Sequence, residues 1–156
     1  MQVTLNFDQL LAVLLASMLP VSELRGAIPL ALSFGAHPLE AYIICVFGNL
    51  LPIIPIMMVL PLIAKWAQYI PFFHKLFALI NRRTEKQQKA VNKYGFIGLT
   101  IFVAVPLPMT GVWTGAAVAY LLGIRKRYAF FALMLGVMLA GALVTLAAGG
   151  VIHLWR

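Results

Sequence analysis

Two long apolar stretches without a charged residue dominate the pattern of hydrophobic and polar positions. They run from Ala41 to Ala64 and from Tyr128 to Ile152. A helix of about 20 apolar residues crosses the hydrocarbon core of a bilayer, so each stretch predicts one transmembrane helix. Proline lacks a backbone N–H and disturbs a helix interior. We therefore expect the first helix to be kinked or locally unwound at its prolines, which are Pro52, Pro55 and Pro61.

Two further stretches, Gln9–Leu39 and Gly95–Ile124, have a length that suits neither one span nor two. Each has about 30 residues, whereas one upright helix needs about 20 and two helices with a turn need about 40. We predict that each forms a re-entrant hairpin with two short arms and a broken tip, where protein or a wet cavity satisfies the free backbone groups. A long tilted helix or two thin spans is the alternative. The prolines near the middle of the two stretches are Pro20 and Pro29, and Pro106 and Pro108.

The two halves of the chain resemble each other when one is shifted by 88 positions. Hairpin then falls on hairpin and span on span. The loop after the first hairpin, Ala36–Glu40, has no Lys or Arg, whereas the corresponding loop Ile124–Tyr128 reads Ile-Arg-Lys-Arg-Tyr. Basic loops lie on the cytoplasmic side, so the halves are expected to form an inverted repeat, as in many secondary transporters. The coinciding residues include Pro20 and Pro108, Ala31 and Ala119, Gly35 and Gly123, Ala41 and Ala129, and Gly48 and Gly136.

Most basic residues lie in two segments. Residues 65–94 and 124–128 contain ten of the twelve Lys and Arg residues, which predicts that both segments are cytoplasmic. We expect an all-α polytopic membrane protein with a single domain, 1–156, made of repeat one (1–64), a basic cytoplasmic linker (65–94) and repeat two (95–156). Apolar residues at helical spacing between Phe72 and Ile80 indicate an interfacial amphipathic helix in the linker, or else a solvated loop that holds the topology.

The composition agrees with this class. Of the 156 residues, 63% are hydrophobic and 10% are charged, far from the globular average. Topology accounts for the net charge of +8, so no nucleic-acid partner is expected. Cys45 is the single cysteine and cannot form an internal disulfide. No metal-ligand spacing, Gly-rich phosphate loop or nucleophile–base pattern occurs, so we expect no metal, no cofactor and no enzymatic activity.

One apolar stretch is broken by a carboxylate and a guanidinium, Glu23 and Arg25. Ionisable groups at membrane depth are costly and usually face a protein interior or a wet cavity. After the shift, Glu23 coincides with the first position of a small-residue ridge, which is expected to face protein. We expect Glu23 to bind a proton and Arg25 to hold Glu23 or an anion; a purely structural pair is the alternative. The ridge is Gly111, Gly115, Ala119 and Gly123.

The remaining candidate residues lie at the two hairpin tips, where hydroxyl groups and freed carbonyls would supply neutral polar contacts. The predicted substrate- and proton-binding site contains, besides Glu23 and Arg25, the residues Ser22, Gly26, Thr110, Gly111, Trp113 and Thr114. The predicted tip backbone contains Pro20, Pro29, Pro106 and Pro108. No catalytic or metal-binding residue is assigned.

Three segments resemble the small multidrug export family of prokaryotes. They read SELRGAIPLALSFGA from Ser22, FGNLLPIIPIMMVLPL from Phe47, and FVAVPLPMTGVWTGAAVAYLLGI from Phe102. The most specific parts are Glu23–Pro29 and Pro106–Gly115. The resemblance covers nearly the whole chain and implies export of small drugs.

The paired hairpins are also distantly similar to the DedA-type membrane proteins. That likeness implies translocation of a polyprenyl-phosphate lipid. DedA-type second hairpins carry an arginine shortly after a Phe-x-x-Pro segment, whereas Met109–Ile124 contains no basic residue. Arg25 would have to serve alone.

The sequence thus predicts a multi-pass secondary transporter of the prokaryotic cytoplasmic membrane. It would be proton-coupled and would move a small amphipathic solute or drug between the two hairpin tips. The alternatives are a translocase (flippase) for a lipid phosphate such as a polyprenyl phosphate, and a non-transporting membrane scaffold. Four hairpin arms and two spans form a thin bundle, so we expect a homodimer.

Overall fold

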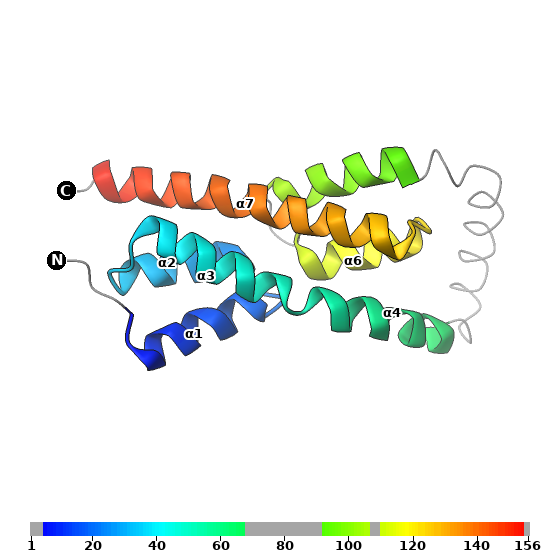
Figure 1. Ribbon diagram of the computed structural model, residues 1–156, viewed down its shortest axis with the longest axis horizontal. Coiled ribbons are helices and arrows are strands. Elements are labelled where there is room, and N and C mark those ends of the chain that lie inside the picture. The colour runs from blue at the N-terminus through cyan, green and yellow to red at the C-terminus, as the bar shows by residue number, and fades with distance from the viewer. Residues whose placement is uncertain (1–4, 68–91, 107–109, 155–156) are drawn as a thin grey trace.

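The chain forms a bundle of helices that lie along one long axis (Figure 1). The structure is a computed structural model that describes residues 5–67, 92–106 and 110–154. Every regular element in these ranges is a helix, which confirms the predicted all-α class. The order is α1 (Phe7–Met18), α2 (Glu23–Ser33), α3 (Pro38–Leu50), α4 (Ile53–Ala67), an unlabelled helix over 92–104, α6 (Val112–Leu121) and α7 (Lys126–Leu154).

Two helical stretches are long and apolar enough to cross a membrane. One is Pro38–Trp66, with 29 residues from α3 and α4, and the other is Lys126–Gly150, with 25 residues of α7. Both predicted spans are therefore present as helical stretches of sufficient length and apolar character. The first is interrupted at Leu51–Pro52, because proline cannot donate the backbone hydrogen bond that a helix needs. Pro55 lies in the first turn of α4 and Pro61 lies inside it, so the helix is broken at only one of the three expected prolines.

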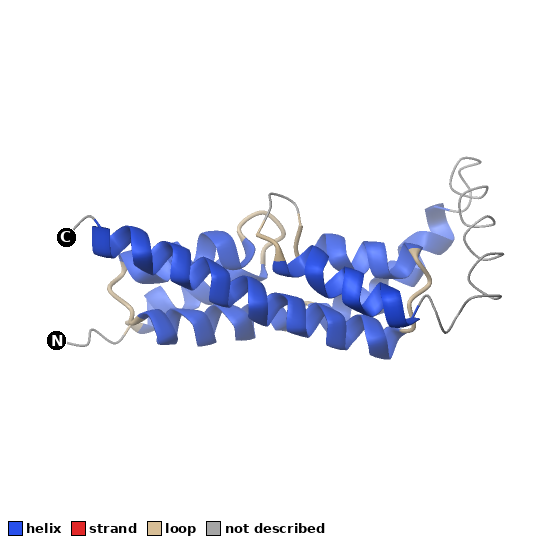
Figure 2. Cartoon of the chain, turned by 90° about the horizontal axis from the view of Figure 1, so that it is seen from above, coloured by secondary structure: helices blue, strands red, loops and turns tan. Residues whose placement is uncertain are grey.

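The two stretches that fit neither one span nor two each fold as two short helices. The first gives α1, with 12 residues, and α2, with 11, and the second gives the helix over 92–104 and α6, with 10 residues. At 1.5 Å per residue these helices are about 15–20 Å long, roughly half the thickness of a bilayer's hydrocarbon core. The turns between them lie near the middle of the molecule (Figures 1 and 2). Neither stretch is one long tilted helix.

Helices α2 and α6 end in the same way. Gly35 and Gly123 have φ angles of 88° and 66°, in the left-handed region that glycine adopts without steric cost. The residue after each glycine donates its N–H to the carbonyl five residues earlier, at 3.1 Å after Gly35 and 3.0 Å after Gly123. This is the hydrogen bond of a Schellman cap. Each cap reverses the chain into the long helix that follows.

Glycines bring the helices into close contact. A Cβ added to Gly48 would overlap the Ser17 hydroxyl, so α3 lies directly against α1. A Cβ on Gly136 would lie 2.7 Å from Val103, so α7 lies directly against the helix over 92–104. A Cβ on Gly115 would also lie 2.7 Å from Val103, which confirms close packing on the predicted ridge. Such contacts join helices in lipid, where no hydrophobic force drives their association.

Two predictions fall outside the described residues. The linker segment between Phe72 and Ile80 lies in the range 68–91, and Pro108 lies in the range 107–109. The division into repeat one, linker and repeat two stays a prediction.

Candidate functional site at two meeting tips

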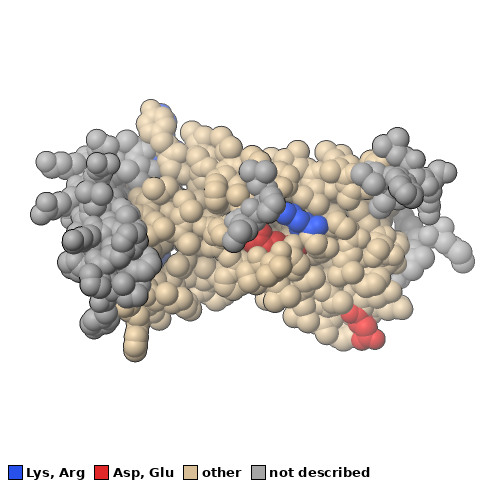
Figure 3. Space-filling model, turned by 180° about the vertical axis from the view of Figure 1, so that it is seen from behind, with Lys and Arg blue, Asp and Glu red and all other residues tan. Residues whose placement is uncertain are grey.

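The turns in the middle of the molecule contact each other. The first tip is residues 18–25, from the last residue of α1 to the start of α2, and the second tip is residues 105–106 and 110–114, before and at the start of α6. Figure 3 shows acidic and basic atoms side by side in the middle of one face, surrounded by residues without charge; another acidic group lies at the lower right edge of this view. Charge in such surroundings calls for specific partners, and the partners come from the opposite tip.

Glu23 begins α2 with a strained backbone. Its φ is 43°, in the left-handed region that costs a residue with a Cβ about 1–2 kcal/mol. Its side chain is only 8% exposed, which agrees with the buried position predicted for it. Its N–H donates to the carbonyl of Leu19 at 3.1 Å, across the turn that contains Pro20. Such strain persists where the surrounding contacts impose it, and it is concentrated at functional sites.

The Glu23 carboxylate occupies the N-terminal end of α6. It accepts hydrogen bonds from the backbone N–H groups of Val112 and Trp113, the first two residues of that helix. These N–H groups have no acceptor within the helix, and the helix dipole favours a negative charge there. A Cβ on Gly111 would overlap the carboxylate, so only glycine leaves room for it. The chain thus supplies its own anion to a helix end suited to anions.

Arg25 also extends to the second tip. Its Nη2 donates to the backbone carbonyl of Thr110 and, at 2.8 Å, to the Thr110 hydroxyl. That hydroxyl donates in turn to the carbonyl of Val105 at 2.8 Å. Glu23 and Arg25 are close enough for their charges to interact, but among the described residues they form no direct ion pair. The sequence left their pairing open, and in the structure both groups bind the opposite tip.

Trp113 makes the contact in the reverse direction. Its indole Nε1–H donates to the carbonyl of Met18 at 3.1 Å, and Met18 is the last residue of α1. Carbonyls in the last turn of a helix receive no hydrogen bond from an N–H group of that helix. The indole therefore supplies a donor to a carbonyl that α1 leaves without one. The two tips therefore bind each other through donors from both sides.

The other candidate residues organise their own tips. The Ser22 hydroxyl donates to the carbonyl of Ala16. Thr114 Oγ1 accepts the N–H of Gly111 at 2.9 Å at the start of α6. A Cβ on Gly26 would lie 3.0 Å from the Ser22 Cβ, so this glycine gives room within the first tip. These three positions shape the tips rather than joining them.

The described tip prolines have different places. Pro20 lies in the exposed turn before Glu23. Pro29 lies inside α2, and Pro106 lies in the second tip; both line an open groove beside Arg25. The groove is described below.

One buried polar residue in the first span was not among the candidates. Asn49 of α3 is 2% exposed, and within the described part of the chain its Oδ1 has no hydrogen-bond partner. A buried polar group without a partner costs free energy. The signal in the sequence is a lone amide inside the apolar stretch Ala41–Ala64, where only charged residues were considered.

The fold and this buried charged site define an integral membrane protein. It has two helical stretches that qualify as spans, and the charged side chains of Glu23 and Arg25 lie where the two tips meet. Within that class, the chain belongs to the family described as "Putative small multi-drug export protein", whose model matches residues 23–143. The match includes Glu23, Arg25 and the second tip. No curated protein and no solved structure matches the chain, and the likeness to DedA-type proteins is not shown.

Proposed function

We propose that this chain is a proton-coupled secondary transporter that moves a small amphipathic solute between the two tips. The observation that carries the proposal is the Glu23 carboxylate. It is buried, lies on strained backbone, and is bound by the backbone N–H groups of the opposite tip. A carboxylate at membrane depth is the group that proton relays in pumps and transporters use. The family description, small multi-drug export, supports transport.

Protonation of Glu23 would control the contact between the tips. Hydrogen bonds to an ionised group are about twice as strong as neutral ones. A proton on the carboxylate removes the charge, weakens the hydrogen bonds from Val112 and Trp113, and frees the anion-binding end of α6. The tips then separate and the solute passes. The transport of each solute molecule is thereby linked to the binding and release of one proton.

We place both tips near the bilayer midplane, as re-entrant hairpins that enter from opposite sides. The short helices reach about halfway along the long ones (Figure 1), and irregular backbone at that depth requires protein contacts of the kind the tips make. Lys65 lies in the last turn of α4, and the N–H of Arg125 donates to Asn92 at 3.1 Å. Lys65, Arg125 and the basic residues beside Arg125 would make the end of the bundle at which α4 ends and α7 begins cytoplasmic, because basic loops lie on the cytoplasmic side.

An inverted repeat accounts for the equivalent features of the two halves. The glycine caps at Gly35 and Gly123 are 88 positions apart and have the same hydrogen bonds. Gly48 and Gly136 have the same separation, and each lies against the first helix of its own half. Two pairs of glycines at corresponding positions, with similar contacts in each pair, support a common structural unit in both halves.

Cysteine labelling tests the placement of the tips. In a Cys45→Ser background, single cysteines replace Asn6, before α1, and His37, after α2. We expect an impermeant maleimide added outside intact cells to label both, and to label a cysteine at Arg127 only after permeabilisation. Labelling of Asn6→Cys and His37→Cys from opposite sides would show that α1 and α2 cross the bilayer, and the re-entrant placement would be wrong.

Proton flux tests the function. The full chain is reconstituted into liposomes that contain a pH-sensitive dye, and amphipathic solutes of either charge are added one at a time. We expect at least one solute to drive proton movement with the native chain, Glu23→Gln to abolish it, and the control Glu40→Gln to retain it. Unchanged proton flux in Glu23→Gln would overturn the coupling role. Absence of flux for every solute would favour a non-transporting scaffold.

The cytoplasmic-membrane location, the homodimer and the absence of enzymatic activity stay predictions. A dimer would double the mass of the protein in detergent micelles after the micelle is subtracted. Light scattering on the full chain measures this mass directly.

A further inference from the structure

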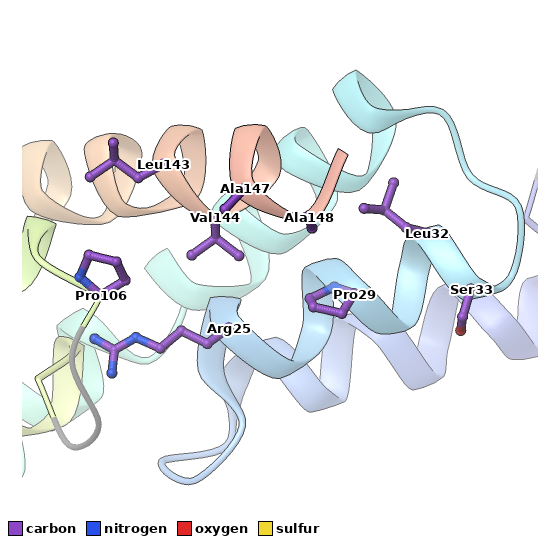
Figure 4. A pocket seen from close by; sticks show the side chains of 9 residues that line it. All are labelled: Arg25, Pro29, Leu32, Ser33, Pro106, Leu143, Val144, Ala147 and Ala148. Atoms are coloured by element: carbon purple, nitrogen blue, oxygen red, sulfur yellow. The ribbon is translucent and has the colours of Figure 1, made fainter. Parts of the chain in front are cut away.

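An open groove runs beside the first tip, between α2 and α7. Its volume is about 800 Å³, within the range of small-molecule sites. Figure 4 shows that the side chains of α7 face those of α2 across it, with the Arg25 guanidinium at the end near Pro106. The lining residues are Arg25, Pro29, Leu32, Ser33, Pro106, Leu143, Val144, Ala147 and Ala148.

The lining of the groove is mostly apolar, and its charge lies at one end. Arg25 is the only charged residue that lines the described groove, and Ser33 is the only other polar one. The Ser33 hydroxyl already donates to the carbonyl of Leu30 at 2.7 Å. Arg25 uses one amino group on Thr110, and a guanidinium has five N–H donors in a fixed fork. Donors therefore remain at one end of an otherwise apolar groove.

We propose that the α2–α7 groove binds an amphipathic anion. The anionic head group would accept hydrogen bonds from Arg25, and the hydrocarbon part would lie between Pro29 and Leu32 on one side and Val144 and Ala147 on the other. An Arg guanidinium suits carboxylate and phosphate oxygens because two parallel N–H groups fit two oxygens. This inference rests on the proposed transport function and names its substrate class.

A second groove in the other half provides a comparison. It lies between α4 and α6, has a volume of about 320 Å³, and has no charged residue in its lining. Five of its seven lining residues correspond to lining residues of the first groove after the shift by 88: Trp113 stands in place of Arg25, and four residues of α4 stand in place of the four α7 residues. The equivalent α4 residues are Pro55, Ile56, Val59 and Leu60, for Leu143, Val144, Ala147 and Ala148. The halves thus contain matched grooves, and only one has a cation.

Equilibrium binding tests the proposal without any gradient. The full chain in dodecyl maltoside micelles is mixed with radiolabelled dodecyl phosphate, dodecanoate or dodecyltrimethylammonium, and binding is measured by scintillation proximity. We expect at least one anion to bind about tenfold more tightly than the cation, since only the anion can accept hydrogen bonds from the Arg25 guanidinium. Preference for dodecyl phosphate would assign phosphate head groups, and preference for dodecanoate would assign carboxylates.

Variants distinguish binding in the groove from partitioning of the ligand into the micelle. Arg25→Gln is expected to weaken anion binding about tenfold, and Ala147→Trp to abolish it by filling the groove. Val59→Trp places the same bulk at the matched position of the other groove and is expected to bind normally. Ala147→Phe replaces Ala147→Trp if gel filtration shows that the larger side chain prevents folding. Equal binding of anion and cation, or anion binding that survives both Arg25→Gln and a filled groove, would overturn the proposal.

The two proposals fail separately. Proton-coupled flux of a cationic solute together with no anion binding would contradict the groove assignment and leave the transporter intact. Selective anion binding at the groove together with no proton flux for any solute would contradict the transporter and leave the groove as an anion site.

Discussion

The two tips contribute different chemistry to one contact. The first tip supplies a carboxylate and a guanidinium, on backbone strained at Glu23. The second tip supplies neutral groups: backbone N–H groups at the start of α6, the Thr110 carbonyl and hydroxyl, and the space left by Gly111. One half of the molecule therefore carries the titratable group and the other half binds it. The two tips thus have different roles, although α2 and α6 end with the same glycine cap.

Filling the space at Gly111 is the most severe test of this contact. In Gly111→Leu the side chain meets the Glu23 carboxylate, and we expect a loss of about 3 kcal/mol of stability from overpacking. Thermal unfolding is followed with a thiol-reactive dye, because Cys45 is the chain's one cysteine and is fully buried.

The control for this test is Gly98→Leu. A Cβ at Gly98 meets nothing within 4 Å, and leucine favours a helix over glycine by roughly 0.8 kcal/mol. Its unfolding temperature should equal or exceed that of the native chain. Equal unfolding temperatures for Gly111→Leu and the native chain would mean that the tips are not packed as described.

Removing the guanidinium tests the contact from the charged side. Arg25→Ala loses the hydrogen bonds to Thr110, and we expect a loss of about 2 kcal/mol, typical of hydrogen bonds to a charged group. Thr110→Val removes only the hydroxyl and keeps the backbone carbonyl, so its loss should be smaller. The same dye assay measures both, and a larger loss for Thr110→Val would contradict the assignment of Arg25 as the main donor.

The glycine caps test where the two halves are alike. Gly35 and Gly123 both have a left-handed φ, so Gly35→Ala and Gly123→Ala should each cost about 1 kcal/mol. Similar shifts in unfolding temperature are expected for the two variants. A cost at only one of the caps would show that the halves are not equivalent at these turns.

Removing the indole N–H is expected to have the smallest effect. Trp113→Phe loses the hydrogen bond to the Met18 carbonyl but keeps an aromatic side chain in the α4–α6 groove. Hydrogen bonds between helices in a membrane contribute about 0.6 kcal/mol on average. A loss above about 2 kcal/mol would mean that Trp113 contributes by packing rather than by this bond.

Local rules predicted most of the described elements, although only one of the three expected prolines breaks the first span. The length of two uncharged apolar stretches predicted both helices that qualify as spans. The first of them is interrupted at a proline, at Leu51–Pro52. The excess length of the other two stretches predicted two short helices in each. Gly35 and Gly123 were found as equivalent positions from sequence, and both adopt the conformation that requires glycine.

The partners of the charged residues were not predictable in the same way. The sequence placed Glu23 and Arg25 in one site but left open whether they pair. Arg25 instead binds Thr110, 85 positions away, and the choice depends on the three-dimensional approach of two irregular turns. Asn49 was missed because an amide carries no charge, although the burial of its Oδ1 without a partner among the described residues also costs free energy. Local propensity contains no information on such long-range contacts.

The break at Leu51–Pro52 makes the two helical stretches that are long enough to cross a membrane mechanically unequal. Pro52 has no amide hydrogen, so one backbone hydrogen bond of the helix is missing there. Helix α7, in contrast, continues for 29 residues without interruption. The stretch formed by α3 and α4 can bend at this point, whereas α7 keeps its direction. Deuterium should consequently enter the amides beside Pro52 earlier than those in the middle of α7.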